Sequence, residues 1–280
     1  MASRSPVVMI TGASRGIGRA VAIDLAARGF DLVLTARSVD GGAVFDGTSR
    51  HDELAGVALP GSLTETAAEC RRARPSCRVS YVAMDLVDET SVRTAARAAL
   101  AEFGHVDALV SNAIYQGPGV NDPLLDLPAE LLRRVMEGDA IAPILLLSEL
   151  LPGMITAGGG VFVHLTSGAA TLVPRAPTGR GGWGVAYAMA KGAAHRIAGV
   201  LHAEHSSDGI RAYSVNPGHV TTDVMRQRAE RAGREVTGQG PDDTVATIAW
   251  LLDGSDEAVA LSGSEVVARD VVSRLRSDSV

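Results

Sequence analysis

Tyr187 and Lys191, four positions apart, could together carry acid–base chemistry. On a helix, residues at i and i+4 lie on one face, so the phenol and the ammonium would be neighbours. A nearby ammonium favours the tyrosinate and lowers the pKa of the phenol, which makes a tyrosine a usable general acid or base. Lys191 is the only lysine among 26 lysine and arginine residues, which indicates a position that needs a compact ammonium. A solvated lysine that happens to follow a tyrosine is the plainer alternative.

A glycine-rich turn near the start of the chain could bind a diphosphate. An apolar stretch leads into Thr11-Gly12-Ala13-Ser14-Arg15-Gly16-Ile17-Gly18, and an amphipathic stretch follows it. Glycines permit a tight turn, and the amide groups at the start of a helix bind phosphate oxygens. The spacing is neither G-x-G-x-x-G nor that of a P-loop, so an ordinary turn between a strand and a helix is the alternative.

Five motifs follow one another along the chain: Thr11-Gly12-x-x-x-Gly16-x-Gly18, Asn112-Ala113, Ser167, Tyr187-x-x-x-Lys191 and Asn216-Pro217-Gly218. Together they resemble the short-chain dehydrogenase/reductase family, and the resemblance spans most of the chain. It implies a single Rossmann-type domain and an oxidoreductase that uses NAD(P)(H). It also implies a homodimer or homotetramer formed through two long helices, here at 128–151 and 185–205.

The resemblance assigns catalytic roles to Ser167, Tyr187 and Lys191. Tyr187 would give a proton to the substrate oxygen during reduction and take it back during oxidation. Ser167 would hold that oxygen by a hydrogen bond, and Lys191 would also bind the ribose hydroxyls beside the nicotinamide. Thr166 competes with Ser167 for this role, because successive side chains along a strand point in opposite directions.

Asp139 occupies a fourth catalytic position, where the family often carries an asparagine that anchors a water relay to the lysine. An ionised aspartate accepts hydrogen bonds but cannot donate one. Asp139 could therefore strengthen the charge pairing of Lys191, or it could weaken the relay.

Arg15 and Arg37 favour NADP(H) as the cofactor, with NAD(H) possible. Arg37 ends the second predicted strand, where an acidic residue suits the free ribose of NAD and an arginine suits a 2′-phosphate. Two arginines can make charge-assisted contacts with one phosphate group. The alternative is that both are solvated surface arginines.

By resemblance, the remaining cofactor contacts are Asp85 and Leu86 at the adenine, Asn112 and Ala113 beside it, and Pro217, Gly218, Val220 and Thr222 at the nicotinamide.

The expected substrate is a hydrophobic ketone or the matching secondary alcohol. The candidate substrate residues are mostly apolar, as small-molecule pockets generally are: Ile114, Tyr115, Trp183 and Met225, with Leu172 and Val173 nearby. No metal site is expected, because the spacing of His195, His202 and His205 is not that of a zinc-binding helix. A protein of the same fold that binds NADP as a sensor or assembly subunit, without catalysis, is the alternative function.

The elements that must position these residues alternate between strands and helices. Nearly continuous apolar runs predict strands at 6–10, 31–36, 78–83, 106–111, 161–166 and 210–215. Amphipathic patterns predict helices at 16–28, 63–73, 89–103, 128–151 and 185–205. Apolar strands that alternate with helices are typical of an α/β fold with a doubly wound parallel sheet, covered by helices on both faces. No linker divides the chain, so residues 1–280 are predicted to form one domain.

Four segments interrupt this alternation. Residues 38–62 form a predicted inserted loop, residues 168–184 an extended active-site loop, and residues 219–240 a substrate-binding excursion. Residues 270–280 are predicted to form a polar tail. Long loops in compact domains are usually functional or disordered.

The composition excludes several classes of function. The net charge of −6 and the dispersed arginines do not favour a nucleic-acid partner. No membrane is expected to be involved, since no uninterrupted apolar run suggests a bilayer span. Two cysteines are too few for a disulfide scaffold, and a cytoplasmic location is expected.

Overall fold

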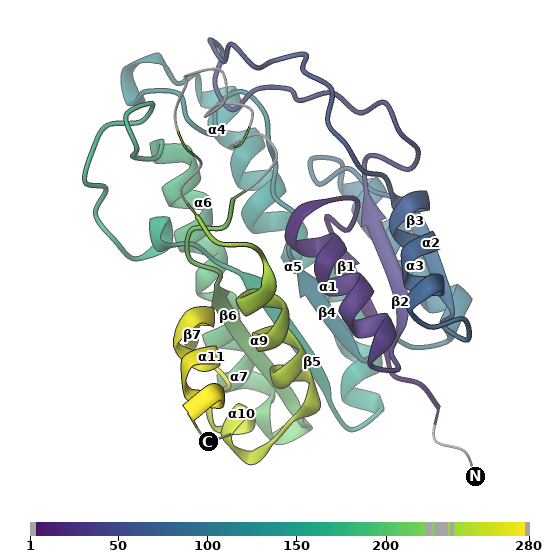
Figure 1. The fold of residues 1–280 in the computed structure, drawn as a ribbon. Helices are drawn as coiled ribbons and strands as arrows, with labels where there is room; N and C mark the ends of the chain where they lie inside the picture. Colours follow the sequence, from purple (N-terminus) through teal and green to yellow (C-terminus); the bar gives the residue numbers. More distant parts are fainter. Residues whose placement is uncertain (1–3, 222–225, 227–234, 236–237, 278–280) are drawn as a thin grey trace.

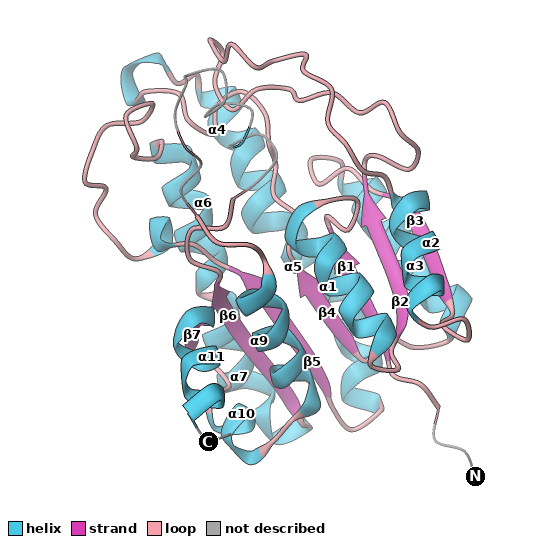
Figure 2. Ribbon diagram, viewed as in Figure 1, coloured by secondary structure: helices cyan, strands magenta, loops and turns pink. Residues whose placement is uncertain are grey.

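The computed structural model describes residues 4–221, 226, 235 and 238–277. These residues form one seven-stranded parallel sheet in the order β3-β2-β1-β4-β5-β6-β7, with helices on both faces (Figures 1 and 2). The strands are β1 (Val7–Thr11), β2 (Asp31–Ala36), β3 (Val79–Ala83), β4 (Ala108–Ser111), β5 (Gly160–Leu165), β6 (Ile210–Asn216) and β7 (Glu265–Val267). The predicted fold class is therefore confirmed.

The two faces of the sheet bury alternate side chains of the same strand. In β1, Val8 and Ile10 join the core beneath one layer of helices, whereas Val7 and Met9 join the core beneath the other. Successive side chains of a strand point to opposite faces, so a strand covered on both sides must be apolar at every position. This is why the first strand reads as an unbroken apolar run.

Helices from distant parts of the chain share each face. The first core receives residues from α1 (Gly16–Ala27), α2 (Leu63–Ala73), α9 (Asp242–Asp253), α10 (Asp256–Ala260) and α11 (Ala268–Ser277). The second core receives residues from α3 (Glu89–Phe103), α5 (Ala142–Thr156) and α7 (Ile197–His205). Of the α-helices in the described residues, α4 (Ala129–Met136) and α6 (Val185–His195) contribute to a smaller apolar cluster beside the carboxyl ends of the strands.

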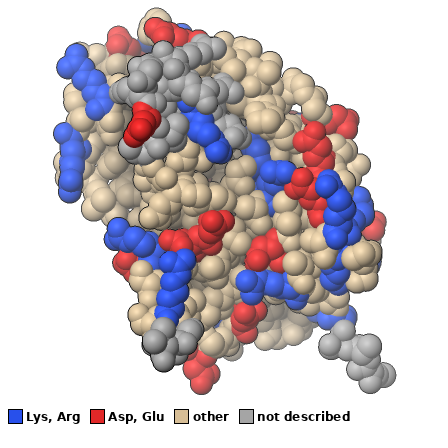
Figure 3. Space-filling model, viewed as in Figure 1, with Lys and Arg blue, Asp and Glu red and all other residues tan. Residues whose placement is uncertain are grey.

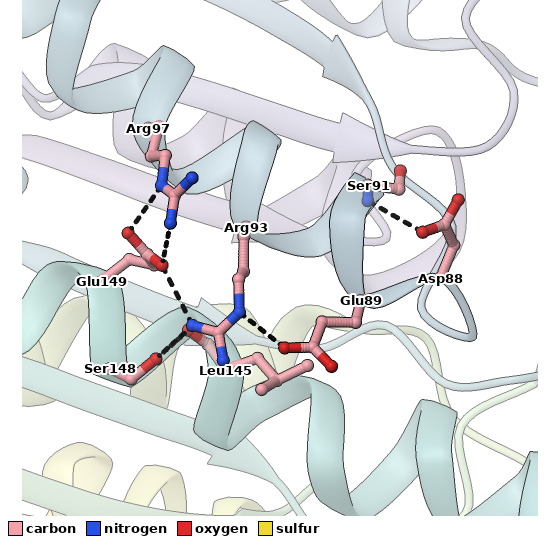
Figure 4. A network of polar contacts seen from close by, with 8 residues as sticks. All are labelled: Asp88, Glu89, Ser91, Arg93, Arg97, Leu145, Ser148 and Glu149. Carbon is pink, nitrogen blue, oxygen red and sulfur yellow. Dashed lines mark hydrogen bonds and ion pairs between the residues drawn. The ribbon is translucent and has the colours of Figure 1, made fainter.

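A cluster of ion pairs joins α3 to α5 on the outside of the second layer (Figure 4). The Glu149 carboxylate on α5 accepts hydrogen bonds from Arg93 at 3.0 Å and from Arg97 at 2.9 and 3.0 Å. These arginines hold the pKa of Glu149 below its usual value. Glu89, one turn before Arg93, accepts a further bond from that arginine at 2.8 Å. The network fixes the position of α5 relative to α3.

The helix predicted at 128–151 is continuous from Ala129 to Thr156 but contains one π-helical turn at Glu137–Ile141. In that turn the Ala142 amide donates to the carbonyl of Glu137, five residues earlier. By length and composition, Ala129–Thr156 could cross a membrane, but 50% of its most apolar window is buried inside the fold. That degree of burial is also found in core helices of soluble proteins.

The helix predicted at 185–205 is interrupted at Arg196, between α6 and α7. The hydroxyl of Ser214, on β6, donates to the carbonyl of His195 at 2.9 Å. That carbonyl would otherwise be the acceptor for an amide four residues later in a regular helix. The competing bond from the sheet therefore gives a physical reason for the interruption.

The C-terminal prediction was wrong. The part of residues 270–280 that the structure describes is not a polar tail but most of α11, which follows directly on β7. Val271 and Val272 are buried against the sheet, while the arginines of the last turn face outward. A strand of three residues is too short for an alternating pattern to be recognised, and α11 alternates apolar and charged residues over only ten positions.

Charged side chains of both signs are interspersed on the face shown in Figure 3, among the residues that the structure describes there. This face has no extended region of a single sign. It therefore offers no electrostatic footprint of the kind that binds nucleic acid without sequence specificity.

Candidate active site

A cleft of about 340 Å³ lies at the carboxyl ends of the strands. It is lined by residues that directly follow β1 to β6, among them Gly12, Arg37, Met84, Asn112, Ser167 and Pro217. The strand order reverses between β1 and β4, and open α/β sheets bind ligands at such a reversal. The topology therefore brings residues from the whole length of the chain to one site.

The glycine turn packs closely against the end of β4. The side-chain amide of Asn112 donates to the carbonyl of Thr11 at 2.8 Å, and the backbone amide of Asn112 donates to the Thr11 hydroxyl at 3.0 Å. A Cβ added to Gly18 would lie 2.4 Å from the Gly12 carbonyl oxygen, and one added to Gly12 would lie 2.8 Å from the Asn112 side chain. Glycine is thus required at both positions, and Asn112 holds the turn in place.

The start of α1 fits a diphosphate. Among the helices of the first layer, α2 is capped by Ser62, which accepts from the Glu65 amide at 3.2 Å, whereas α1 has no side-chain cap and no acidic residue in its first turn. Gly16, with φ of +56°, faces open space in the left-handed conformation that other residues rarely adopt. The first amides of α1 are therefore suited to an anion that enters the cleft.

Arg15 and Arg37 both line the end of the cleft formed by β2 and the loop after it. Arg15 donates to the carbonyls of Pro60 and Gly61 at 2.9 and 3.1 Å, and so holds the end of the predicted inserted loop. Arg37 forms an ion pair with Asp46 of the same loop at 2.8 Å. Both cations lie where a ribose phosphate was predicted, but each already contacts the loop at residues 38–62.

Ser167 and Tyr187 lie together at the opposite end of the cleft. Burial raises the pKa of Tyr187, while a hydrogen bond with the Ser167 side chain lowers it and the negative charge of Asp139 raises it further. The net shift is upward, and Lys191, which was predicted to lower this pKa, is not among the groups that shift it in this structure. The protonated phenol is the favoured form.

Lys191 and Asp139 form a buried pair of charged residues behind the tyrosine. The ammonium of Lys191 donates to the carbonyl of Leu165 at 2.7 Å, and burial lowers the pKa of this lysine while Asp139 raises it. Burial raises the pKa of Asp139 to about 6, against the opposing effects of Lys191 and the Tyr115 amide. Asp139 is 1% exposed, and this burial is the main cause of its raised pKa.

One oxygen of Asp139 is satisfied within the described residues and the other is not. Oδ1 accepts from the Tyr115 amide, and Oδ2 is buried with no hydrogen-bond partner among the described protein groups. Buried polar atoms of this kind are commonly satisfied by water. This geometry is compatible with the water relay that the resemblance implies, and the π-helical turn is the element that carries the carboxylate inward.

The structure places Thr166 and Ser167 differently. The Thr166 hydroxyl lies 3.0 Å from Nδ1 of His195 and is buried, whereas the Ser167 side chain accepts from the Ala169 amide and bonds to Tyr187. Of the two candidates, Ser167 is therefore the one directed at the tyrosine.

His164 was not singled out in the sequence, although it lies near the reaction centre. It is 1% exposed, its Nδ1 lies 3.3 Å from the Ser111 hydroxyl, and its Nε2 has no partner among the described residues. Burial and the charges of Lys191 and His195 hold its pKa well below the usual value, so it is neutral. Its position within an apolar strand gave no signal beyond a lone polar residue.

The predicted substrate residues are only partly brought together. Ile114 lines the cleft, while Trp183 lies outside its lining, and Thr222 and Met225 lie outside the described residues. Tyr115 lines the cleft but its phenol is within electrostatic reach of Arg37 and Asp46, at the opposite end from Tyr187. Its assignment to the substrate stays a prediction. A Cβ added to Gly138 would lie 2.7 Å from the Tyr115 Cβ, so glycine allows this close approach.

Several lining residues come from the predicted inserted loop and were missed as contacts. They share an origin in residues 38–62 and are Ser38, Val44, Phe45, Asp46 and Leu59. A single aromatic residue in a glycine-rich segment was the one available signal, since Phe45 is 2% exposed and fixes the loop against the fold.

The histidines of the helix at 185–205 each have a separate partner, and no metal-binding cluster occurs among the described residues.

Comparisons with known proteins agree with this geometry. The family described as short chain dehydrogenase matches residues 6–51 and 55–233. The chain is 31% identical over 245 residues to dehydrogenase/reductase SDR family member 7B of Bos taurus, covering 85% of this chain and 66% of that protein. It is 28% identical over 270 residues to 2-(R)-hydroxypropyl-CoM dehydrogenase of Xanthobacter autotrophicus, covering 94% of this chain and 96% of that protein.

A solved structure shares the fold over nearly its whole length. L-sorbose reductase of Gluconobacter frateurii, in complex with NADPH and L-sorbose, superposes with a TM-score of 0.76 at 25% identity. The match covers 95% of this chain and 96% of that one. From the family match, the parallel sheet and the cleft that holds the glycine turn, we conclude that the chain belongs to the short-chain dehydrogenase/reductase family, and that it is an NAD(P)-binding oxidoreductase acting on CH–OH groups.

Proposed function

We propose that this chain is an NADP(H)-dependent reductase of a hydrophobic ketone, which also oxidises the matching secondary alcohol. The observation that carries the proposal is the arrangement of one cleft. Ser167, Tyr187 and Lys191 lie at one end of it, and Arg15 and Arg37 lie at the other. The glycine turn between them is suited to the diphosphate that would join the two ends.

Within this proposal, the nicotinamide cofactor supplies or accepts the hydride when it is bound. Ser167 holds the substrate oxygen by a hydrogen bond, and Tyr187 donates the phenolic proton to that oxygen during reduction. The raised pKa of Tyr187 favours the protonated form, which is the one that donates a proton during reduction. Lys191 would hold the ribose hydroxyls, and a water bound at the unsatisfied Oδ2 of Asp139 would connect this lysine to a proton supply for the tyrosine.

The remaining cofactor contacts are proposed from positions around the cleft. Asp85 and Leu86 follow β3, and Asn112 and Ala113 follow β4, so both pairs are placed to line the adenosine half. Pro217, Gly218 and Val220 follow β6 beside Tyr187 and are proposed to meet the nicotinamide. Preference for NADP(H) over NAD(H) rests on Arg15 and Arg37, since guanidinium groups bind phosphate bidentately.

The substrate class is proposed from apolar surface next to Ser167. Leu172 and Val173 are 64% and 85% exposed, on the loop that follows Ser167, and Ile114 lines the cleft. Leu172 and Val173 are not part of the cleft lining, but exposed apolar groups on a loop that begins at the cleft favour binding of an apolar ligand.

A panel of carbonyl compounds, offered with NADPH and with NADH, tests the proposal. We expect NADPH oxidation with bulky apolar ketones, and a loss of about 10²–10⁴-fold in kcat for Tyr187→Phe at unchanged NADPH affinity. Equal kcat/KM with NADH would remove the role given to the two arginines. Tight NADPH binding without turnover on the whole panel would instead favour the non-catalytic sensor.

The long helices of this chain expose apolar surface that could bind a second copy. Four large apolar side chains are exposed on the helices predicted to form the interface: Ile141, Ile144, Met189 and Val200, at 40%, 52%, 48% and 50%. Exposed apolar residues clustered on packed helices suit association with a second copy. We propose a cytoplasmic homodimer or homotetramer that uses this surface.

A further inference from the structure

Asp46 is an acidic side chain built into the end of the cleft where a ribose phosphate is proposed to bind. Its Oδ2 lies 2.8 Å from Nη1 of Arg37, and both residues line the cleft. Among the described residues of the lining, Asp46 and Asp85 are the only acidic ones. Asp85 accepts from the Val87 amide at 3.2 Å and lies at the end of a different strand. Asp46 is thus the carboxylate that faces the arginine.

The backbone on either side of Asp46 is fixed. Phe45 is 2% exposed, its amide donates to the Val57 carbonyl at 2.8 Å, and its carbonyl accepts from the Gly56 amide at 2.7 Å. The Leu59 amide donates to the Ala43 carbonyl at 2.8 Å. The two limbs of the loop therefore pair with each other. This pairing holds the backbone next to Asp46 in place, close to Arg37.

The far side of the same loop is anchored across the cleft. The Asn121 amide donates to the Thr48 carbonyl at 2.7 Å, and the Arg50 amide donates to the fully buried Asp122 at 3.0 Å. These bonds join the loop after β2 to the segment after β4. The loop spans the cleft and carries its carboxylate to a fixed place.

We propose that Asp46 is a specificity-determining residue that weakens the binding of NADP(H) relative to NAD(H). This inference rests on the proposed role of Arg37 as a phosphate contact. A 2′-phosphate and the carboxylate would compete for one guanidinium and would repel each other at short range. The cofactor without the phosphate would meet neither effect. The chain therefore discriminates between the two cofactors less strongly than its pair of arginines alone would imply.

Calorimetric titration of the full chain with NADPH, NADH, adenosine 2′,5′-bisphosphate and AMP tests this inference. For Asp46→Asn we expect NADPH and the bisphosphate to bind about fivefold to tenfold more tightly, from the Coulomb repulsion removed at partly screened contact distance. NADH and AMP should change less than about twofold, since they lack the phosphate. Asp46→Glu, which keeps the charge, should retain the wild-type preference.

Asp40→Asn is the matched control. Asp40 belongs to the same loop and carries the same charge, but it is exposed and is not part of the cleft lining. It should leave the ratio of NADPH to NADH affinity unchanged, and a change as large as that of Asp46→Asn would contradict a local effect. An equal effect of Asp46→Asn on both cofactors, or weaker NADPH binding, would overturn the inference.

The titrations also separate this inference from the proposed function. If wild-type protein binds NADH as tightly as NADPH and Asp46→Asn restores a preference for NADPH, the role of Asp46 stands and the proposed preference of the natural chain fails. If the wild type prefers NADPH and Asp46→Asn leaves that preference unchanged, the proposed function stands and the role of Asp46 fails.

Discussion

Asp139 is the residue at which the reaction centre differs most from its expected chemistry. A carboxylate with a pKa of about 6 lies buried beside Lys191 and acts electrostatically on Tyr187. Its negative charge favours the protonated forms of both neighbours. The charge state of this one group therefore adds to the effect of burial on how readily Tyr187 loses its proton.

Replacement of Asp139 by asparagine should shift the pH dependence of catalysis. Without the negative charge, the pKa of Tyr187 falls, so the tyrosinate forms at lower pH. The rate of alcohol oxidation should then begin to rise at lower pH than in the wild type. Measured profiles of kcat/KM that coincide for Asp139→Asn and wild type would show that the carboxylate does not act on the tyrosine.

The same substitution should change the pH dependence of stability. The folded-state pKa of about 6 lies above the ordinary value of 3.8, so ionisation of Asp139 destabilises the fold. The stability present below about pH 4 is lost as pH rises through 6. Asparagine resembles the protonated carboxyl, so Asp139→Asn should be more stable by on the order of 2–3 kcal/mol at pH 7.5, with no difference at pH 4. Urea denaturation at the two pH values measures this, and an equal difference at both would contradict it.

At the scale of elements, the loop at residues 38–62 depends on Asp122 for its far attachment. Asp122 accepts from the amides of Arg50 and Gly119, both at 3.0 Å, and is fully buried. Loss of these bonds would leave buried amides unsatisfied. The bonds from the Asn121 amide to the Thr48 carbonyl and from the Arg50 side chain to the Asp126 carbonyl would remain, so the loop would be held more loosely to the segment after β4.

Asp122→Ala should accordingly increase cleavage at Arg50 by trypsin about tenfold or more, because looser attachment exposes the loop. The KM for the cofactor should rise as well, since the loop lines the cleft. Asp126→Asn is the control, because Asp126 lies in the same segment with an exposed side chain. Cleavage of Asp122→Ala at the wild-type rate would show that the loop is held by other contacts.

The elements that apolar patterns specify strongly could be predicted from the sequence. Strands β1 to β6 follow from continuous apolar runs, and the ends differ from the predicted ones by one or two residues. β7 could not be found, because three residues carry too little pattern, and its partner Asn216 lies far away in the chain. The interruption at Arg196 also escaped prediction, since the Ser214 hydroxyl that competes for the His195 carbonyl comes from another element.

Some residues of the candidate site could be predicted from the sequence and others could not. Tyr187, Lys191 and the glycine turn follow from local spacing, and the structure brings them to one cleft. Asp46 and Phe45 could not be placed, because a loop without periodic pattern gives no indication of which of its side chains returns to the sheet. The raised pKa of Tyr187 likewise depends on burial, which spacing does not reveal.

At the scale of the whole molecule, the exposed apolar surface on α5 and α7 predicts self-association. Ile144→Glu together with Val200→Glu places charges where two apolar surfaces would meet, so the oligomer should dissociate. Sedimentation velocity measures the mass of the particle. Leu125→Glu is the control, since Leu125 is 97% exposed but lies outside these helices. An unchanged mass for the double variant would place the interface elsewhere.

The π-helical turn at Glu137–Ile141 has a consequence for how this protein can be altered. Each residue of a helix advances the direction of its side chain by about 100°, so in a regular helix one additional residue would reset the angular phase of everything after it. Asp139 is directed into the reaction centre, while Ile141 and Ile144, just beyond it, are exposed. The turn accommodates its additional residue locally, so deleting one residue here would restore a regular helix and leave the exposed residues after it in place, while the turn that directs Asp139 inward would be lost. The additional residue of this turn therefore concerns the inward direction of Asp139 and not the orientation of the exposed surface.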